Sequence, residues 1–179
     1  MVKISEVEVG QEFEKVVTNI TRDQIKAYAK ASGDNNPIHI NEEIAEKAGL
    51  KGVIAHGLLF MGFVGVMLTD LAGDGGKVVK WGGQFRGTVR PGDDVITKAK
   101  VTEINGNQVS LEITQMSKTP IKIEKDGEVV KTFEAEEKGW IEEKDIEEDL
   151  IKTEEVDDGT LSYRLRLSWP GSAVLELAE

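Results

Sequence analysis

An apolar stretch from Val53 to Leu68 constrains the fold more than any other part of the chain, because only His56 and several glycines interrupt it. The stretch is shorter than the ~20 apolar residues that a membrane-spanning helix needs, so we expect a buried helix over about Gly57 to Leu71. Apolar residues lie on every face of this helix, and a helix of that kind is surrounded by protein. The rest of the chain must therefore supply a large apolar surface to enclose it.

The segments that follow this helix have the alternating pattern of strands. Strict apolar/polar alternation is clearest over 109–114, Asn105-Gly106-Asn107 predicts a hairpin and Pro91-Gly92-Asp93 predicts a turn. Strands joined by hairpins form an antiparallel sheet with one apolar face, and the apolar helix is the only candidate large enough to cover it. The predicted fold class is α+β, a curved antiparallel sheet wrapped around a long central helix. The predicted strands are 78–89, 94–104, 108–117 and 128–136.

The N-terminal part of the chain predicts a strand over 11–20 and two capped helices. Thr21 and Gln24 have the spacing of a capping box, and Gly33 ends the helix that they start. Pro37 excludes a helix interior over 33–37. Asn41 then caps a short helix over 42–48.

The C-terminal residues differ in composition from the rest of the chain. Residues 141–160 hold ten acidic and two basic residues, so they carry −8 of the net charge of −11 and leave −3 for the remainder. We therefore predict a domain over 1–140 and an acidic extension over 141–179. Alternation over 161–169 predicts one extra strand in the extension. This strand has three open roles: extending the sheet, covering the pocket or contacting a partner.

Composition also excludes several kinds of chemistry. The chain has no cysteine, which rules out disulfides, thiolate metal sites and a thiol nucleophile, and its two histidines argue against a multi-histidine metal site. We expect no metal and no cofactor. An acidic chain repels nucleic acids and anionic membranes, so we expect neither as a partner. The N-terminus lacks the apolar core of a signal peptide, which predicts a cytoplasmic protein.

One loop gathers residues that can perform acid–base chemistry. Asp34 and His39 lie in the rigid loop beside the apolar helix, and a carboxylate and an imidazole that share one water can move its proton in both directions. Gly57 lies where the helix begins, and a first-turn N–H there can stabilise a developing oxyanion. These residues indicate chemistry next to a carbonyl. On the residues alone, an ordinary turn with a solvated histidine remains the alternative.

The sequence Asp34-Asn35-Asn36-Pro37-Ile38-His39, preceded by Ser-Gly and followed by Ala55-His56-Gly57-Leu58-Leu59, resembles the motif of the MaoC-like dehydratases or (R)-specific enoyl-CoA hydratases. The resemblance runs from about residue 11 to 140, and Val-Arg-Pro-Gly-Asp at 89–93 matches a later turn of the family. It implies the hot-dog fold and a hydro-lyase of fatty acid metabolism. The implied reaction is the reversible hydration of trans-2-enoyl thioesters, linked to CoA or to an acyl carrier protein, to (R)-3-hydroxyacyl thioesters.

The resemblance also assigns roles to individual positions. Asp34 and His39 match the catalytic pair that activates water, and Gly57 matches the glycine whose N–H polarises the thioester carbonyl. Asn36 matches the asparagine that shapes the loop, whereas His56 is expected to be a structural or capping residue. The chain departs from several members at Gly65, where they have a serine; this leaves rate and substrate range open.

The implied CoA or phosphopantetheine carrier is anionic and requires a local basic patch. Lys80, Arg86 and Arg90 are the candidates for phosphate contacts, with a solvated surface charge as the alternative for each. Trp81 is a candidate for the acyl pocket together with Phe60 and Phe63, although core packing is the expected role of the two phenylalanines.

Family members usually pair two hot-dog units. This chain has one copy of the motif, so we expect a homodimer with each site at the subunit boundary. Two alternatives remain open: an acyl thioesterase on the same fold, and a non-catalytic assembly subunit of an acyl-processing complex. The intact Asp34/His39 pair argues against the second.

Overall fold

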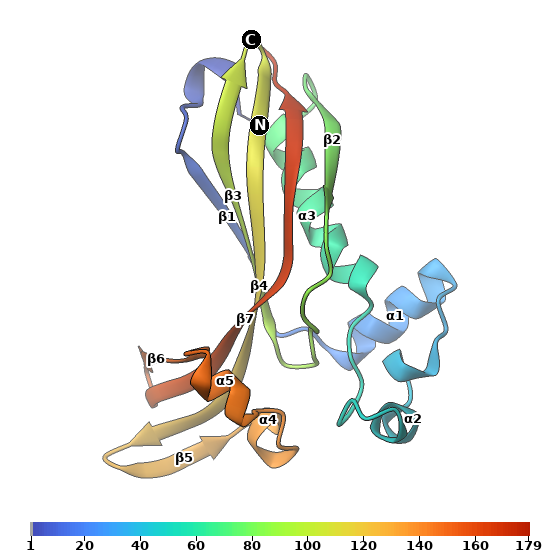
Figure 1. The fold of residues 1–179 in the computed structure, drawn as a ribbon, viewed down its shortest axis with the longest axis vertical. Helices are drawn as coiled ribbons and strands as arrows, with labels where there is room; N and C mark the ends of the chain where they lie inside the picture. Colours follow the sequence, from blue (N-terminus) through green and yellow to red (C-terminus); the bar gives the residue numbers. More distant parts are fainter. Residues whose placement is uncertain (1) are drawn as a thin grey trace.

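The computed structural model describes residues 2–179 and is built around a seven-stranded antiparallel sheet. The strand order is β1-β3-β4-β7-β2, with β5 paired to β4 and β6 paired to β7. Figure 1 shows β4 and β7 running from the end near the C-terminus down into a separate lobe. The predicted α+β class is confirmed. The strands are β1 (Glu12–Val17), β2 (Lys77–Gly83), β3 (Asp94–Asn105), β4 (Gln108–Lys125), β5 (Glu128–Thr132), β6 (Ile151–Val156) and β7 (Gly159–Glu176).

The ends of the helices are set by capping residues close to them in sequence. The Thr21 hydroxyl accepts the N–H of Gln24, whose side chain in turn accepts the Thr21 N–H, so the predicted capping box is present. Gly33 ends this helix with a φ of 79°, and Asn41 caps the next by accepting the N–H of Ile44. The helices are η1 (Ile4–Glu6), α1 (Arg22–Ser32), η2 (Pro37–His39), α2 (Glu42–Lys47), α3 (Gly57–Ala72), α4 (Glu134–Glu137) and α5 (Glu143–Glu147).

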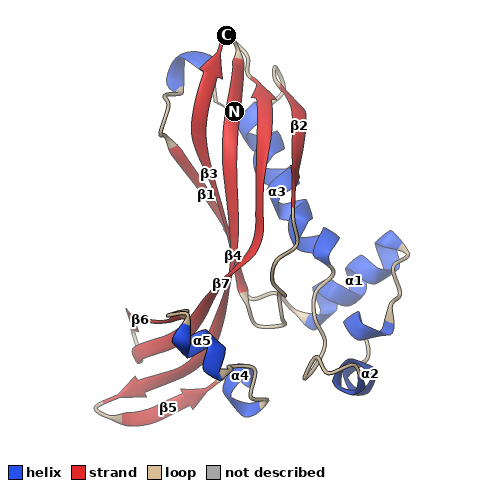
Figure 2. Ribbon diagram, in the orientation of Figure 1, coloured by secondary structure: helices blue, strands red, loops and turns tan. Residues whose placement is uncertain are grey.

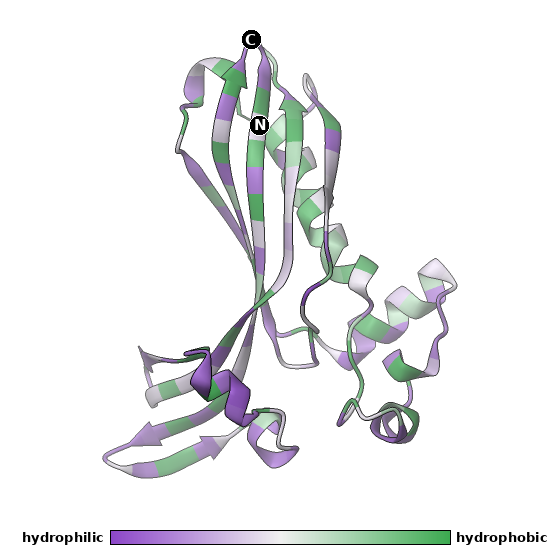
Figure 3. Ribbon diagram, in the orientation of Figure 1, coloured by the Kyte–Doolittle hydropathy of each residue, from purple (hydrophilic) through white to green (hydrophobic). Residues whose placement is uncertain are grey.

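The main core lies between α3 and one face of the sheet. Phe60, Val64 and Leu68 of α3 are buried in one cluster with apolar residues of β3, β4 and β7. Figure 2 shows the helix running along the sheet, and Figure 3 shows that the helix is predominantly apolar whereas hydrophobic and hydrophilic residues alternate along the strands. Within residues 2–179, no helix combines the length and the apolar composition that a bilayer crossing requires.

The prediction that α3 is surrounded by protein is wrong for a single chain. Leu58 and Val66, on the face away from the sheet, remain 60% and 48% exposed. Val79, on the neighbouring edge strand β2, is also exposed. The helix is apolar as predicted, but this chain covers only one of its faces.

The predicted boundary at residue 140 also needs correction, because it cuts through the sheet. β7 lies between β4 and β2, and its register with β4 extends from Glu176 opposite Gln108 to Thr160 opposite Glu124. Trp169 of this strand is fully buried in the main core. Extension of the sheet is therefore the role of the extra strand. Acidic composition over 141–160 marks a surface lobe rather than a separate domain.

This lobe consists of β5, α4, α5 and β6 together with the adjoining halves of β4 and β7; we call it the β5–β6 lobe (residues 118–165) (Figure 1). Its centre is a buried ion pair in which Arg164 donates to Asp145 at 3.2 Å. The lobe reaches α1 and α2 through Arg22, which donates to both Glu134 and Glu42.

Two predicted strands end early. β2 stops at Gly83, after which residues 84–87 leave the regular ladder while Gln84 and Arg86 still donate backbone N–H groups to carbonyls of β7. β5 stops at Thr132, and α4 replaces the end of the predicted segment.

Candidate active site

The loop after α1 is held in shape by side chains bonded to its own backbone. The N–H of Asp34 donates to the Ser32 hydroxyl at 3.2 Å, and the N–H of Asn36 donates to Asp34 Oδ1 at 3.2 Å. Asn36 Oδ1 then accepts the N–H of Ile38 at 3.3 Å. Such bonds are typical of Asn and Asp in tight turns. Asn36 thus shapes the loop, and the Asp34 carboxylate stays on its exposed side.

His39 ends the short helix η2 and has a defined tautomer. Its Nδ1–H donates to the carbonyl oxygen of Ile54 at 2.8 Å, which leaves Nε2 as an acceptor. Partial burial lowers the pKa of His39 from its usual value of 6.5; the neighbouring His56 lowers it further, while the Ile54 bond and Asp34 act in the opposite direction. His39 is therefore a neutral imidazole at pH 7, able to take a proton at Nε2.

Asp34 and His39 are brought together, and a second histidine joins them. Side-chain atoms of Asp34, His39 and His56 lie within 4.8 Å of one another. The two imidazole rings stack with centroids 3.9 Å apart and planes inclined at 29°. Ring-nitrogen lone pairs lie in the ring planes, so those of two stacked rings run alongside each other instead of converging on one ion. We therefore assign no metal site to this trio, and the absence of a cofactor stays a prediction.

Gly57 is the first residue of α3, where the backbone N–H has no intrahelical acceptor. A Cβ atom at this position would lie only 3.0 Å from Cε1 of Phe85. The Phe85 ring in turn packs edge-on against Phe60, with centroids 5.7 Å apart. The absence of a side chain thus lets an aromatic ring lie directly against the helix start.

The residues predicted to contact the phosphates and the acyl chain lie in different surroundings. Lys80 and Arg86 are exposed, on β2 and on the loop that follows it. Trp81 is half-buried and covers Gly65, where a side chain would begin 3.6 Å from the indole ring. With Val66 it lines a hollow of about 370 Å³ on the outer side of α3.

Arg90 is not available for the phosphate contact that the sequence suggested. It is only 9% exposed, its Nη2 donates to the carbonyl of Leu50 at 2.8 Å, and its guanidinium lies over the Trp140 ring. Its backbone N–H donates to Asp93, and burial raises the pKa of that carboxyl to about 7. The turn around Arg90 is therefore a buried structural joint between the sheet and the β5–β6 lobe.

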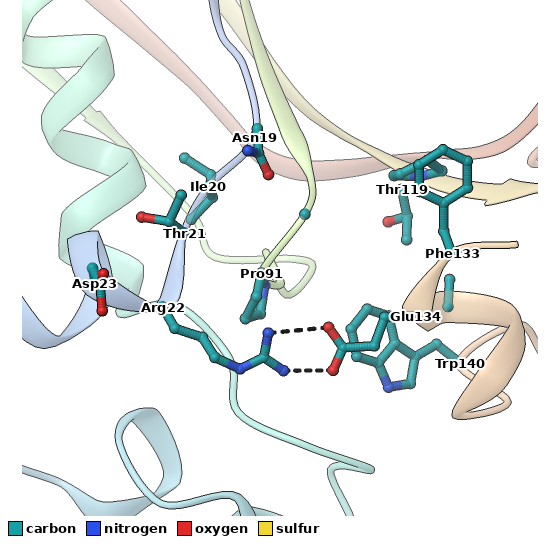
Figure 4. Close-up of a pocket in the computed structure, with 13 residues that line it drawn as sticks. Asn19, Ile20, Thr21, Arg22, Asp23, Pro91, Thr119, Phe133, Glu134 and Trp140 are labelled. Atoms are coloured by element: carbon teal, nitrogen blue, oxygen red, sulfur yellow. Dashed lines mark hydrogen bonds and ion pairs between the residues drawn. The ribbon is translucent and has the colours of Figure 1, made fainter. Parts of the chain in front are cut away.

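A cavity of about 400 Å³ lies between α1 and this lobe (Figure 4). Arg22 and Glu134 cross it as a paired guanidinium and carboxylate, and Pro91 and Trp140 line its walls. Asp34, His39 and Gly57 are not among its lining residues. The cavity belongs to the joint with the lobe and is separate from the acid–base pair.

Two residues that contact the Asp34/His39 site carry only weak signals in the sequence. The backbone of Ile54 carries no side-chain signal, although its carbonyl orients His39. His56 has the structural role that the sequence predicts, since its side chain bonds to the backbone of Asp34, and its ring also stacks on His39. Its place directly before Gly57 was the available signal.

A curved antiparallel sheet packed around one long helix defines the hot-dog class of α+β proteins. The chain belongs to the MaoC-like domain family, which matches residues 5–125. The predicted family and hot-dog fold are confirmed.

Two curated relatives are named as a hydratase and a dehydratase of CoA compounds. The chain is 39% identical over 84 residues to the (R)-specific enoyl-CoA hydratase of Rhodospirillum rubrum, covering 46% of this chain and 58% of that protein. It is 35% identical over 100 residues to the 3-hydroxybutyryl-CoA dehydratase of Methylorubrum extorquens, covering 55% and 63%. The matched region is thus less than two thirds of each relative.

Solved structures extend the likeness over nearly the whole chain. An R-hydratase from Pseudomonas aeruginosa in its unliganded form superposes with a TM-score of 0.66 at 21% identity, covering 99% of this chain and 86% of that one. The (R)-hydratase from A. caviae gives 0.62 at 20% identity, covering 96% and 97%. At these identities the likeness establishes the fold.

Proposed function

We propose that the protein catalyses the reversible hydration of trans-2-enoyl thioesters to (R)-3-hydroxyacyl thioesters, as a hydro-lyase. The observation that carries the proposal is the close approach of Asp34 and a neutral His39 beside the start of α3. The names of the curated relatives support the same reaction class.

In the proposed reaction, one water lies between the Asp34 carboxylate and His39 Nε2. The pair removes a proton from the water as its oxygen attacks Cβ, and the electrons of the C=C bond move onto the thioester carbonyl. The N–H of Gly57 donates to the resulting enolate oxygen, assisted by the helix dipole. The proton taken from the water is then delivered to Cα, so the net change is the addition of one water and no cofactor is required.

The proposed substrate carrier is CoA or an acyl carrier protein. Lys80 and Arg86 are exposed cations on the edge of the sheet and remain candidates for contacts with its phosphates. Cytoplasmic location also stays a prediction.

We also propose a homodimer that covers the outer face of α3. Leu58, Val66 and Val79 form an exposed apolar surface beside the free edge of β2. Such a surface is typical of a protein–protein contact, and a second copy would continue the sheet across the edge strand. Analytical ultracentrifugation tests the dimer; a monomer at micromolar concentration would contradict it.

The reaction is tested with purified protein and crotonyl-CoA, following the loss of enoyl absorbance and, in parallel, the release of free thiol. Hydration should occur without thiol release and should be lost in Asp34→Asn and in His39→Gln. Thiol release without hydration would instead support the thioesterase alternative. No turnover of any thioester would favour the assembly-subunit alternative, which the comparisons do not favour.

A further inference from the structure

His56 contacts both members of the proposed acid–base pair. It is 2% exposed, its Nε2–H donates to the backbone carbonyl of Asp34 at 3.0 Å, and one face of its ring stacks on His39. We propose that His56 is a positioning residue, whose N–H fixes the Asp34 backbone and whose ring face fixes the His39 imidazole. This inference rests on the proposed hydratase function and adds to it a residue that orients both members of the pair.

The hydrogen bond of His56 fixes which ring nitrogen is the donor. Because Nε2 donates, the neutral ring has an unprotonated Nδ1, and within residues 2–179 this buried atom has no hydrogen-bond partner. The titratable groups that face the ring are Asp34 in the loop, His39 in η2 and Tyr28 in α1. Nε2 of His56 is therefore the donor in this arrangement, and Nδ1 faces no acceptor or donor of the described residues.

A phenylalanine could fill the same space without leaving a buried nitrogen unsatisfied. An unsatisfied buried acceptor costs stability. Histidine at position 56 is therefore explained only by an interaction that phenylalanine cannot make. Within this site that contribution is the Nε2–H on Asp34. The ring face is the part that phenylalanine would retain.

The short segment 54–57 thus contacts or supplies all three groups of the proposed site: His39, Asp34 and the N–H of Gly57. The carbonyl of Ile54 accepts from His39, the side chain of His56 donates to Asp34, and Gly57 presents its N–H. The segment is itself anchored to the turn that precedes β3, because the N–H of Ala55 donates to the carbonyl of Val89 at 2.8 Å.

Two substitutions separate the two contributions. His56→Gln keeps an N–H donor at the reach of Nε2 but removes the ring, whereas His56→Phe keeps a ring and removes the donor. The chain has only two histidines, so in either variant the single imidazole NMR signal belongs to His39.

With crotonyl-CoA, His56→Phe should lower kcat roughly tenfold, the effect of one lost hydrogen bond, with KM nearly unchanged. His56→Gln should retain most of kcat. The NMR titration should show the reverse order: the pKa of His39 rises in His56→Gln, because the ring that shields it from water is gone, and stays low in His56→Phe.

Equal losses of kcat in both variants, in step with losses of Tm, together with an unchanged His39 titration, would mean that His56 only fills space and would overturn the inference. A wild-type measurement applies even if a variant fails to fold: 15N shifts should show His56 protonated at Nε2, and protonation at Nδ1 would overturn the inference. If the wild type does not hydrate crotonyl-CoA, the proposed function fails, while the NMR titration still decides whether His56 shields His39.

Discussion

The Nδ1–H of His39 donates to the carbonyl oxygen of Ile54 at 2.8 Å, which joins the loop after α1 to the segment that leads into α3. This bond fixes which nitrogen of the ring is free. It also orients the ring, because an imidazole held at Nδ1 presents Nε2 on its opposite side. The proposed base is therefore oriented before substrate binds.

The first prediction concerns pH. Burial holds the pKa of His39 below 6.5, so the neutral form needed to accept a proton persists into mildly acidic solution. The acid limb of kcat/KM should therefore lie below pH 6.5, with activity falling as pH decreases through the lowered pKa. A pH profile with crotonyl-CoA checks this, and a limb above pH 6.5 that persists in Asp34→Glu would contradict it.

The second prediction concerns the packing of Gly57 on Phe85. In Gly57→Ala the new methyl group would lie 3.0 Å from Phe85 Cε1, so the ring or the helix start must shift. We expect kcat to fall roughly tenfold, less than the ~10²–10³ lost when an oxyanion donor is removed outright. Adding Phe85→Ala should restore much of the rate because it removes the clash. A double variant as slow as Gly57→Ala would show that this contact is irrelevant.

The third prediction concerns the buried carboxyl of Asp93. Burial raises its pKa to about 7 in the folded protein, above the ordinary value of 3.8, so the folded state binds this proton more readily than the unfolded state. Its contribution to stability is complete at low pH and is lost as pH rises through 7. The Tm of Asp93→Asn relative to wild type should therefore increase between about pH 5 and about pH 8. The exposed Asp23→Asn serves as the control, and a pH-independent difference for Asp93→Asn would refute the prediction.

The fourth prediction concerns the ion pair inside the β5–β6 lobe. Arg164→Met would leave the Asp145 carboxylate buried without its cation, which should cost about 3–5 kcal/mol of unfolding free energy. Adding Asp145→Leu should recover a large part of the loss. Urea unfolding checks both variants against Lys144→Met, which removes an exposed pair worth about 0–1 kcal/mol. Similar losses for Arg164→Met and Lys144→Met would contradict the prediction.

The features predicted correctly from the sequence are those that neighbouring residues determine. Thr21 and Gln24 form their capping box, and Asn105 and Gln108 pair across a two-residue turn, because each pair is close in sequence. The loop around Asp34 follows from Asn36 and its neighbours in the same way. The proximity of Asp34 and His39 could therefore be expected from the sequence, whereas their role in acid–base chemistry stays a prediction.

The features that the sequence predicted wrongly depend on contacts between residues that are distant in sequence. β7 lies between β4 and β2, and its residue Glu176 pairs with Gln108, 68 positions earlier in the sequence. Alternation of apolar and polar residues predicts a strand but does not predict which strands it pairs with. Arg90 looks like a surface cation until Trp140 and Leu50 enclose it. The outer face of α3 is a third such case. An apolar pattern indicates that a surface is covered, but it does not show which chain covers it.

The central claim is that Asp34 and His39 act on one water as a unit. The most direct test measures kcat for crotonyl-CoA hydration in Asp34→Asn, His39→Gln and the double variant, with Asn35→Ala as the loop control. When two groups act as a unit, removing one of them already removes the contribution of both to kcat. The double variant should therefore be about as slow as the slower single variant. Rate losses that multiply in the double variant would show that the two residues act independently, and would contradict the claim.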